Sequence, residues 1–212
     1  MFATTRGWSS ATRQIPQKPK ESPPQKFVSA TLTAEDGPAG LINNAGVGCR
    51  GGLLEQPRER AEQTVRVNIL GTLGLTHRLR RKLRRDCTTI VNVASSVAYH
   101  PLPYMSVYAA SKAFILNWSL ALSEELRETN RVVTFSPSGT RTNFQHASGV
   151  KGAQGTDLLA PAEVARAILH TTHRGKKHRL LGLKSRVLVG VSRLLPIPLR
   201  LYLWRRLFAA AR

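Results

Sequence analysis

The segment YAASK has a phenol and an ammonium group four residues apart, at Tyr108 and Lys112. On a helix, positions i and i+4 lie on the same face, so both side chains can contact one ligand. A phenol has a reference pKa of about 10 and is a weak base at neutral pH. A lysine charge close by favours the phenolate. We therefore expect Lys112 to lower the pKa of Tyr108 toward the range in which proton transfer is efficient.

Two serines precede this helix, at the end of the apolar and β-branched segment TTIVNVAS, residues 88–95. The segment predicts a buried strand, and Ser95 and Ser96 would lie at its carboxyl end, where open α/β sheets bind ligands. A serine hydroxyl at this edge could hydrogen-bond a carbonyl group while Tyr108 exchanges a proton with it.

Strands and helices are predicted to alternate along most of the chain. Strands are predicted at 41–45, 88–95 and 131–136, and helices at 57–85, 106–129 and 161–173. Pro57 and Pro161 stand where proline is favoured, in the first turn of a helix. This alternation predicts an α/β fold in which helices cover both faces of a parallel sheet.

The charge of the chain is strongly positive, with 32 lysine and arginine residues against 12 acidic residues and a formal net charge of +20. A solvated, arginine-rich surface explains this excess, and so does a contact with a polyanion such as nucleic acid, anionic lipid or a phosphorylated ligand. Two cysteines and no signal-peptide pattern predict a reducing, cytoplasmic location. No apolar stretch is long enough to predict a transmembrane helix.

Residues 186–212 form a basic, amphipathic tail that is interrupted by Pro196 and Pro198. Three interpretations remain open for it. It could be a lid or partner-facing helix pair, a segment that lies on an anionic membrane surface, or a nucleic-acid contact. Nucleic acid is the least favoured of the three because no recognised DNA- or RNA-binding motif accompanies the charge.

Four motifs follow one another in an order typical of one protein family. They are N-N-A-G in LINNAG, Asn68 in VRVNILGTL, the serine pair of NVASSVA followed by YAASK, and the segment SPSGTRTNF. Over roughly residues 28–170 the chain thus resembles the short-chain dehydrogenase/reductase family. The resemblance implies a Rossmann-like, doubly wound parallel sheet.

The same resemblance implies roles for single residues. Tyr108 would be the general acid/base, and Lys112 would lower its pKa and bind the nicotinamide ribose. Ser96, the second serine of the pair, would orient the substrate. Asn68 would hold a water molecule that relays protons from Lys112 to solvent.

The implied cofactor is NAD or NADP. Asn44, Ala45 and Gly46 would lie near its adenosine half, and Thr142 would contact the nicotinamide carboxamide. Ser138 stands where the family's segment has its glycine. No metal-ligating motif is identified.

The family's T-G-x-x-x-G-x-G turn does not occur before LINNAG, so we expect a sheet that is incomplete at its N-terminal half. Gly46, Gly48 and Gly51 have G-x-G-x-x-G spacing, but the pattern is interpreted as a loop after a strand because no helix is predicted directly behind it. Without the family's first strand, LINNA becomes an edge strand. A homodimer, a partner, or the segment FVSAT (27–31), interpreted as a remnant of the third strand, would cover that edge.

Three regions are predicted: a disordered arm at 1–27, a Rossmann-like domain at 28–185 and the basic tail at 186–212. The first functional hypothesis is an NAD(P)-dependent oxidoreductase that interconverts a carbonyl and a secondary alcohol on a small, apolar substrate. The second is a catalytically silent binding or dimerisation module that has lost the pyrophosphate site. The third is a protein that works at a membrane periphery through its tail. A homo-oligomer is expected in the first two cases.

Overall fold

A five-stranded sheet forms the centre of the computed structural model, which describes residues 30–32, 40–85, 88–141 and 158–209. Its strands are adjacent in chain order: β1 (Ala30–Leu32), β2 (Gly40–Asn43), β3 (Thr89–Val93), β4 (Arg131–Ser136) and β5 (His178–Leu180). The strands from β2 to β5 run parallel to their neighbours. The predicted α/β class and parallel sheet are thus confirmed, whereas β5 was not predicted.

Strand β1 covers the free edge of β2. It pairs antiparallel, with Ala30 opposite Ile42 and Leu32 opposite Gly40. Of the three alternatives for covering this edge, the structure shows the segment that includes Ala30 and Thr31. Its antiparallel pairing differs from that expected of a remnant of the third parallel strand. The connection, residues 33–39, is too short for the crossover of about a dozen residues that a parallel pair requires.

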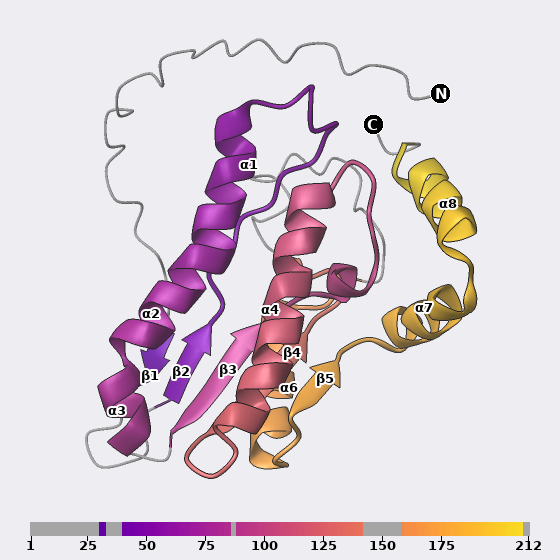
Figure 1. Ribbon diagram of the computed structural model, residues 1–212. Coiled ribbons are helices and arrows are strands. Elements are labelled where there is room, and N and C mark those ends of the chain that lie inside the picture. Colours follow the sequence, from indigo (N-terminus) through magenta and orange to yellow (C-terminus); the bar gives the residue numbers. More distant parts are fainter. Residues whose placement is uncertain (1–29, 33–39, 86–87, 142–157, 210–212) are drawn as a thin grey trace, which may run out of the picture.

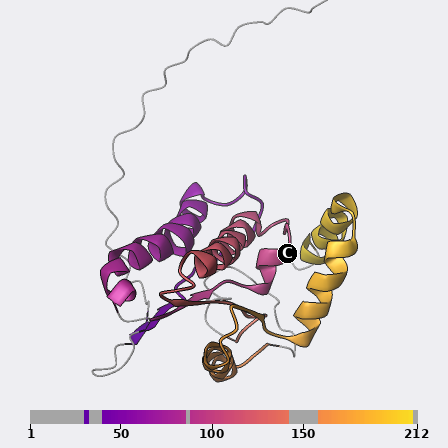
Figure 2. The same ribbon diagram turned by 60° about the horizontal axis from the view of Figure 1, so that its bottom comes forward.

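Helices lie on both faces of the sheet (Figures 1 and 2). One face carries α4 (Ser106–Glu125) and a long, nearly continuous helical stretch, whose parts are α1 (Arg58–Val65), η1 (Arg66–Gly71), α2 (Thr72–Arg78) and α3 (Arg80–Arg85). The other face carries α6 (Pro161–His173). Pro161 begins α6 as predicted, whereas Pro57 lies at the N-cap of α1, one residue before the helix.

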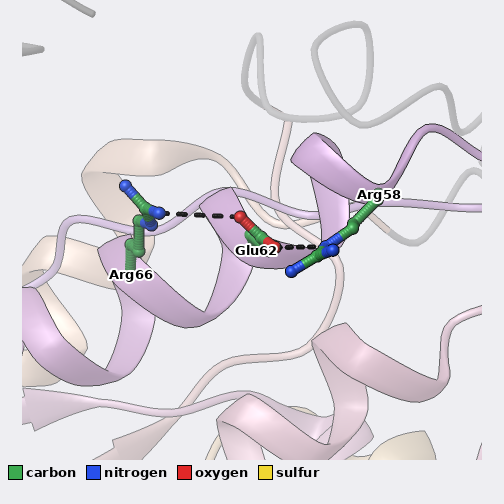
Figure 3. Close-up of polar contacts among 3 residues, drawn as sticks. All are labelled: Arg58, Glu62 and Arg66. Atoms are coloured by element: carbon green, nitrogen blue, oxygen red, sulfur yellow. Dashed lines mark hydrogen bonds and ion pairs between the residues drawn. The ribbon is translucent and has the colours of Figure 1, made fainter. Parts of the chain in front are cut away.

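A cluster of three charged residues lies on the exposed side of α1 and the start of η1. Figure 3 shows Glu62 between Arg58 and Arg66, each of them four residues away along the helix. The Arg58 Nε–Glu62 Oε1 distance is 2.5 Å and the Arg66 Nη2–Glu62 Oε2 distance is 3.5 Å. Exposed pairs with this spacing contribute only about 0.3–0.5 kcal/mol each, so packing against α4 and the sheet must supply most of the stability of this helix.

The core lies on both sides of β3 and β4. Val91, Val93, Val133 and Phe135 pack with Ile168 of α6. On the opposite face, a cluster formed by Leu41, Leu83, Ile90 and Val132 packs against α2, α3 and α4. Successive side chains of a strand point to opposite faces, so neighbouring apolar residues such as Ile90 and Val91, or Val132 and Val133, are what a strand buried on both sides requires.

Two further helices, α7 (Leu183–Leu194) and α8 (Ile197–Ala209), lie at one side of the sheet, beyond β5 (Figure 1). The chain is extended at Leu195, so the predicted break near Pro196 is confirmed, while Pro198 falls in the first turn of α8. The tail predicted from residue 186 begins inside α7. The arm predicted at 1–27 lies outside the described residues.

The core predicts one stability difference. Phe135 is fully buried between β3, β4 and α6, and Phe135→Ala should lower the free energy of unfolding by about 3–5 kcal/mol through lost burial and the cavity left behind. Leu54→Ala is the control, since Leu54 is 99% exposed and its loss should change stability by less than about 0.5 kcal/mol. Urea unfolding followed by circular dichroism measures both, and equal midpoints for the two variants would contradict the assigned core.

Candidate active site

The candidate site lies where β2 and β3 end and the first two turns of α4 pass over them. Its most constrained group is the ammonium of Lys112, which is buried and donates a hydrogen bond to the carbonyl oxygen of Val93, the last residue of β3, at 2.9 Å. Burial lowers the pKa of Lys112 to about 8, because an apolar environment disfavours the charged form.

Tyr108 lies one helical turn before Lys112 and is also buried. Its side chain hydrogen-bonds with that of Ser95, which lowers the pKa of the phenol, but burial has the larger effect and raises it to about 12. The expectation that Lys112 lowers this pKa is therefore wrong for this structure, since desolvation outweighs the favourable interactions of the phenolate. At neutral pH Tyr108 is a protonated phenol.

The two serines after β3 have different surroundings. Ser95 caps the short helix η2 (Ser96–Tyr99): its hydroxyl accepts a hydrogen bond from the Val97 amide at 3.4 Å and also meets Tyr108. The Ser96 amide donates to the carbonyl of Pro137 at 2.9 Å. The structure thus brings Ser95 to the phenol, and the orienting role of Ser96 stays a prediction.

Asn68 holds the loop after β2 in place. It lies in the π-helical segment η1 and is buried. Its amide oxygen accepts from the Val47 amide at 2.8 Å, and its amide nitrogen donates to the Val47 carbonyl at 2.9 Å and to the Ser111 hydroxyl at 2.8 Å. Both N–H groups of the side chain are thus used within the protein, and its water-relay role stays a prediction.

The loop that Asn68 fixes passes close to Lys112. A Cβ at Gly46 would lie 3.3 Å from Lys112 Nζ and 3.4 Å from Asn68 Oδ1, so glycine permits this close approach. Asn44 and Ala45 precede it directly after β2, at the same sheet edge. Helix α1 begins only at Arg58, so the interpretation of the G-x-G-x-x-G spacing as loop is confirmed for this conformation. Thr142 lies outside the described residues.

The inner side of α8 packs against the residues around Tyr108. Trp204 and Phe208 of α8 pack with Tyr108, Leu102 and Met105. Arg50, in the loop after β2, donates to the Phe208 carbonyl at 2.9 Å. Side chains that lie about a hundred residues apart in the sequence therefore pack around the phenol.

His100, in the segment after η2, joins both tail helices. Its Nδ1 hydrogen-bonds with the Ser192 hydroxyl of α7 at 3.0 Å, and its ring centre lies 4.6 Å from that of Trp204 in α8. Burial is the main cause that lowers the pKa of His100 to about 4, with smaller contributions from the charges of Arg200 and Arg193. The imidazole is therefore neutral at physiological pH.

An apolar cavity of about 590 Å³ lies beside the site. Its walls come from the segment after η2, from one side of α4 and from Leu201 of α8. Leu102 and Ala109 belong both to this wall and to the cluster around Tyr108. The cavity therefore adjoins the residues that pack around Tyr108, but Tyr108 itself does not line it.

The site combines a phenol and a buried ammonium one helical turn apart with a serine at the carboxyl edge of a Rossmann-like sheet. This arrangement is typical of an α/β protein that transfers a proton at an oxygen atom. The sequence model described as short chain dehydrogenase matches residues 25–151. The chain belongs to the short-chain dehydrogenase/reductase family.

Several relatives support this assignment. A probable oxidoreductase EphD of Mycobacterium bovis is 31% identical over 191 residues, covering 80% of this chain and 32% of the relative. An NADPH-dependent 1-acyldihydroxyacetone phosphate reductase of Schizosaccharomyces pombe is 34% identical over 106 residues, covering 50% of this chain and 36% of the relative. A short-chain dehydrogenase from Sphingobium yanoikuyae, solved in complex with NADPH, superposes with a TM-score of 0.63 at 29% identity, covering 73% of this chain and 62% of that one. The chain thus spans about a third of the length of the two curated relatives.

The hydrogen bonds of Asn68 predict a large effect of its removal. Asn68→Ala leaves the half-buried Val47 amide and carbonyl without these partners, and it should lower the free energy of unfolding by about 2–3 kcal/mol. Asn117→Ala is the matched control: Asn117 makes one hydrogen bond on the exposed side of α4, and its loss should change stability by less than about 0.5 kcal/mol. Equal urea midpoints would show that Asn68 does not hold the loop.

The buried state of His100 predicts a pH dependence of stability. Between its ordinary pKa of 6.5 and its folded pKa of about 4, the unfolded chain binds a proton that the folded chain does not. The free energy of unfolding should therefore fall as the pH is lowered through this range. His178 also has a lowered pKa and contributes in the same direction, so the wild type should be compared with His100→Asn in urea unfolding at a series of pH values. Parallel curves for the two proteins would contradict the assignment.

Proposed function

We propose that this chain is an NAD(P)-dependent oxidoreductase that interconverts a carbonyl group and a secondary alcohol. The observation that carries the proposal is the hydrogen-bonded arrangement of Ser95 and Tyr108 next to the buried ammonium of Lys112. When bound, the nicotinamide would supply or accept the hydride at the carbonyl carbon. In reduction, Tyr108 gives its hydroxyl proton to the carbonyl oxygen, and in oxidation it takes that proton back.

The protonation states in the site suit the direction of reduction. Burial raises the pKa of Tyr108 to about 12, so the phenol holds the proton that it must give. The Ser95 hydroxyl, which meets Tyr108, can also hydrogen-bond the substrate carbonyl. It therefore takes the orienting role that the sequence assigned to Ser96.

The residues around Lys112 fit the nicotinamide end of the cofactor. One N–H of its ammonium donates to Val93, and the remaining two are suited to the ribose hydroxyls. Asn44, Ala45, Gly46 and Thr142 remain predicted cofactor contacts, and Asn68 a predicted relay. Among the described residues, no glycine-rich turn at a helix N-terminus precedes β2. The described residues therefore fit the nicotinamide end of the cofactor but provide no such site for its pyrophosphate.

We propose an apolar carbonyl or alcohol, of acyl-lipid type, as the substrate. The cavity beside Tyr108 has a mainly apolar lining that includes Leu102 and Leu201. The name of the Schizosaccharomyces pombe relative gives its substrate as 1-acyldihydroxyacetone phosphate, a ketone that carries an acyl chain.

The second candidate is a catalytically silent module that binds a ligand or a second copy of the chain. The incomplete fit to the pyrophosphate is the observation that favours it. The two candidates differ in whether the chain binds a nicotinamide cofactor, and a direct titration separates them.

NADPH and NADH should each be titrated into the full chain while tryptophan fluorescence is recorded, with micromolar binding expected for at least one. Lys112→Met should weaken that binding by at least about tenfold through the lost ribose contacts, whereas Lys177→Met, which changes an exposed lysine paired with Glu124, should leave it unchanged. Tyr108→Phe should retain the binding but reduce NADPH-driven reduction of long-chain ketones by about 10²–10⁴-fold. Absence of binding at millimolar concentrations of both cofactors would overturn the proposal in favour of the silent module.

A further inference from the structure

Helix α7 has a mostly polar side toward the protein and its apolar side toward solvent. The inner side holds Ser185, Val189 and Ser192, of which Ser192 is 4% exposed and bonds His100. The Arg193 guanidinium also lies over the Tyr99 ring, 5.5 Å from its centre. The opposite side carries an apolar stripe at i, i+4, i+8 and i+11, all of it exposed: Leu183, Val187, Val191 and Leu194. Leu194 is 85% exposed. A helix that only packs on its own domain would have the reverse arrangement.

Helix α8 is apolar on two sides. The inner side places Trp204 and Phe208 against the cluster around Tyr108. About a third of a turn away around the helix, Leu199, Leu203 and Leu207 follow one another at four-residue spacing and are exposed, Leu207 by 62%. The inner side accounts for the packing of α8, so the outer leucines need another explanation.

The same surface is basic. Both helices carry exposed cations, and no acidic residue follows Glu163 in the sequence. The cations are Lys184, Arg186, Arg193, Arg205 and Arg206. The Arg206 guanidinium lies over the ring of Tyr202, 5.2 Å from its centre. Apolar stripes with flanking arginines and an exposed tyrosine are the composition of helices that lie in the interface of an anionic bilayer.

We infer that the outer face of α7 and α8, formed by the two stripes and these cations, docks on an anionic membrane surface. The helices would lie in the plane of the interface, since no described helix is both long and apolar enough to cross a bilayer. This inference does not depend on the proposed enzymatic function. It concerns a different surface, at the side of the sheet in Figure 1.

The charge distribution favours a lipid surface over two other occupants. A second copy docked through the same face would bring two acid-free, basic surfaces together, and like charges would repel. Nucleic acid would attract the cations but would leave the apolar stripes without a partner. An anionic bilayer satisfies both features, since its headgroups attract the arginines and its acyl region accepts leucine side chains.

The test is co-sedimentation of the full-length chain with vesicles. Phosphatidylcholine vesicles that contain phosphatidylserine should bind the protein, pure phosphatidylcholine vesicles should bind it at least about tenfold more weakly, and added salt should reduce the binding. Equal binding to the two kinds of vesicle, or binding to neither, would overturn the inference.

A stripe variant with three leucines replaced tests the apolar contribution: Leu194→Gln, Leu203→Gln and Leu207→Gln. Its matched control has the same change at three exposed leucines elsewhere: Leu53→Gln, Leu54→Gln and Leu70→Gln. The stripe variant should partition at least about tenfold more weakly, while the control should bind as the wild type does. Both variants should retain the circular dichroism of the wild type, because every altered side chain is exposed. Similar partitioning of the stripe variant and the wild type would overturn the inference.

A charge variant tests the second feature: Arg186→Gln, Arg205→Gln and Arg206→Gln. Its matched control removes three exposed arginines from α2 and α3, with the same change in net charge: Arg78→Gln, Arg80→Gln and Arg81→Gln. Loss of binding in both variants alike would mean that net charge and not this face is responsible, which contradicts the inference. Sedimentation velocity without lipid gives the remaining check. If the wild type is a dimer and the stripe variant is a monomer, the face binds a second copy of the chain and the inference is overturned.

Discussion

The burial of the Lys112 ammonium is the constraint on which the site depends. A charged group taken out of water is costly, and the hydrogen bond to Val93 offsets part of that cost. The bond requires that β3 ends where α4 crosses it. It also requires that the loop after β2 comes close without a side chain, which Gly46 permits and Asn68 enforces through Val47. The sheet, α4 and the long helical stretch are thus positioned relative to one nitrogen atom.

Most of the fold could be predicted from the sequence, because β2, β3, β4, α4 and α6 carry strong local signals, either apolar β-branched runs or helical periodicity. The direction of β1 and the existence of β5 could not be predicted from the sequence. A strand of three residues is defined by the neighbour with which it pairs and not by its own pattern. In the site, Tyr108 and Lys112 were found by their spacing. The choice between Ser95 and Ser96 depends on how the chain turns after β3. The direction of the Tyr108 pKa shift depends on burial, which the tail helices supply from distant residues.

Helix α8 connects the site around Tyr108 with the outer face of the tail. Its Trp204 side encloses Tyr108, and its Leu203 side faces outward. A helix with its side chains is about 10–12 Å across, so one helix separates the phenol from the outer surface. An apolar ligand that entered beside Leu201 would therefore pass from the outside to the neighbourhood of Tyr108 along a single structural element.

The π-helical turn at Arg66–Gly71 also restricts how the length of the chain can vary. A π turn amounts to one extra residue inside an α-helix. Removing that residue would restore the regular spacing and rotate everything before it by about 100° relative to everything after it. Thr64, which is buried against Cys49, would then turn away from the loop that Asn68 fixes. Single-residue deletions between Thr64 and Asn68 should therefore be more damaging than substitutions of exposed side chains in this helix.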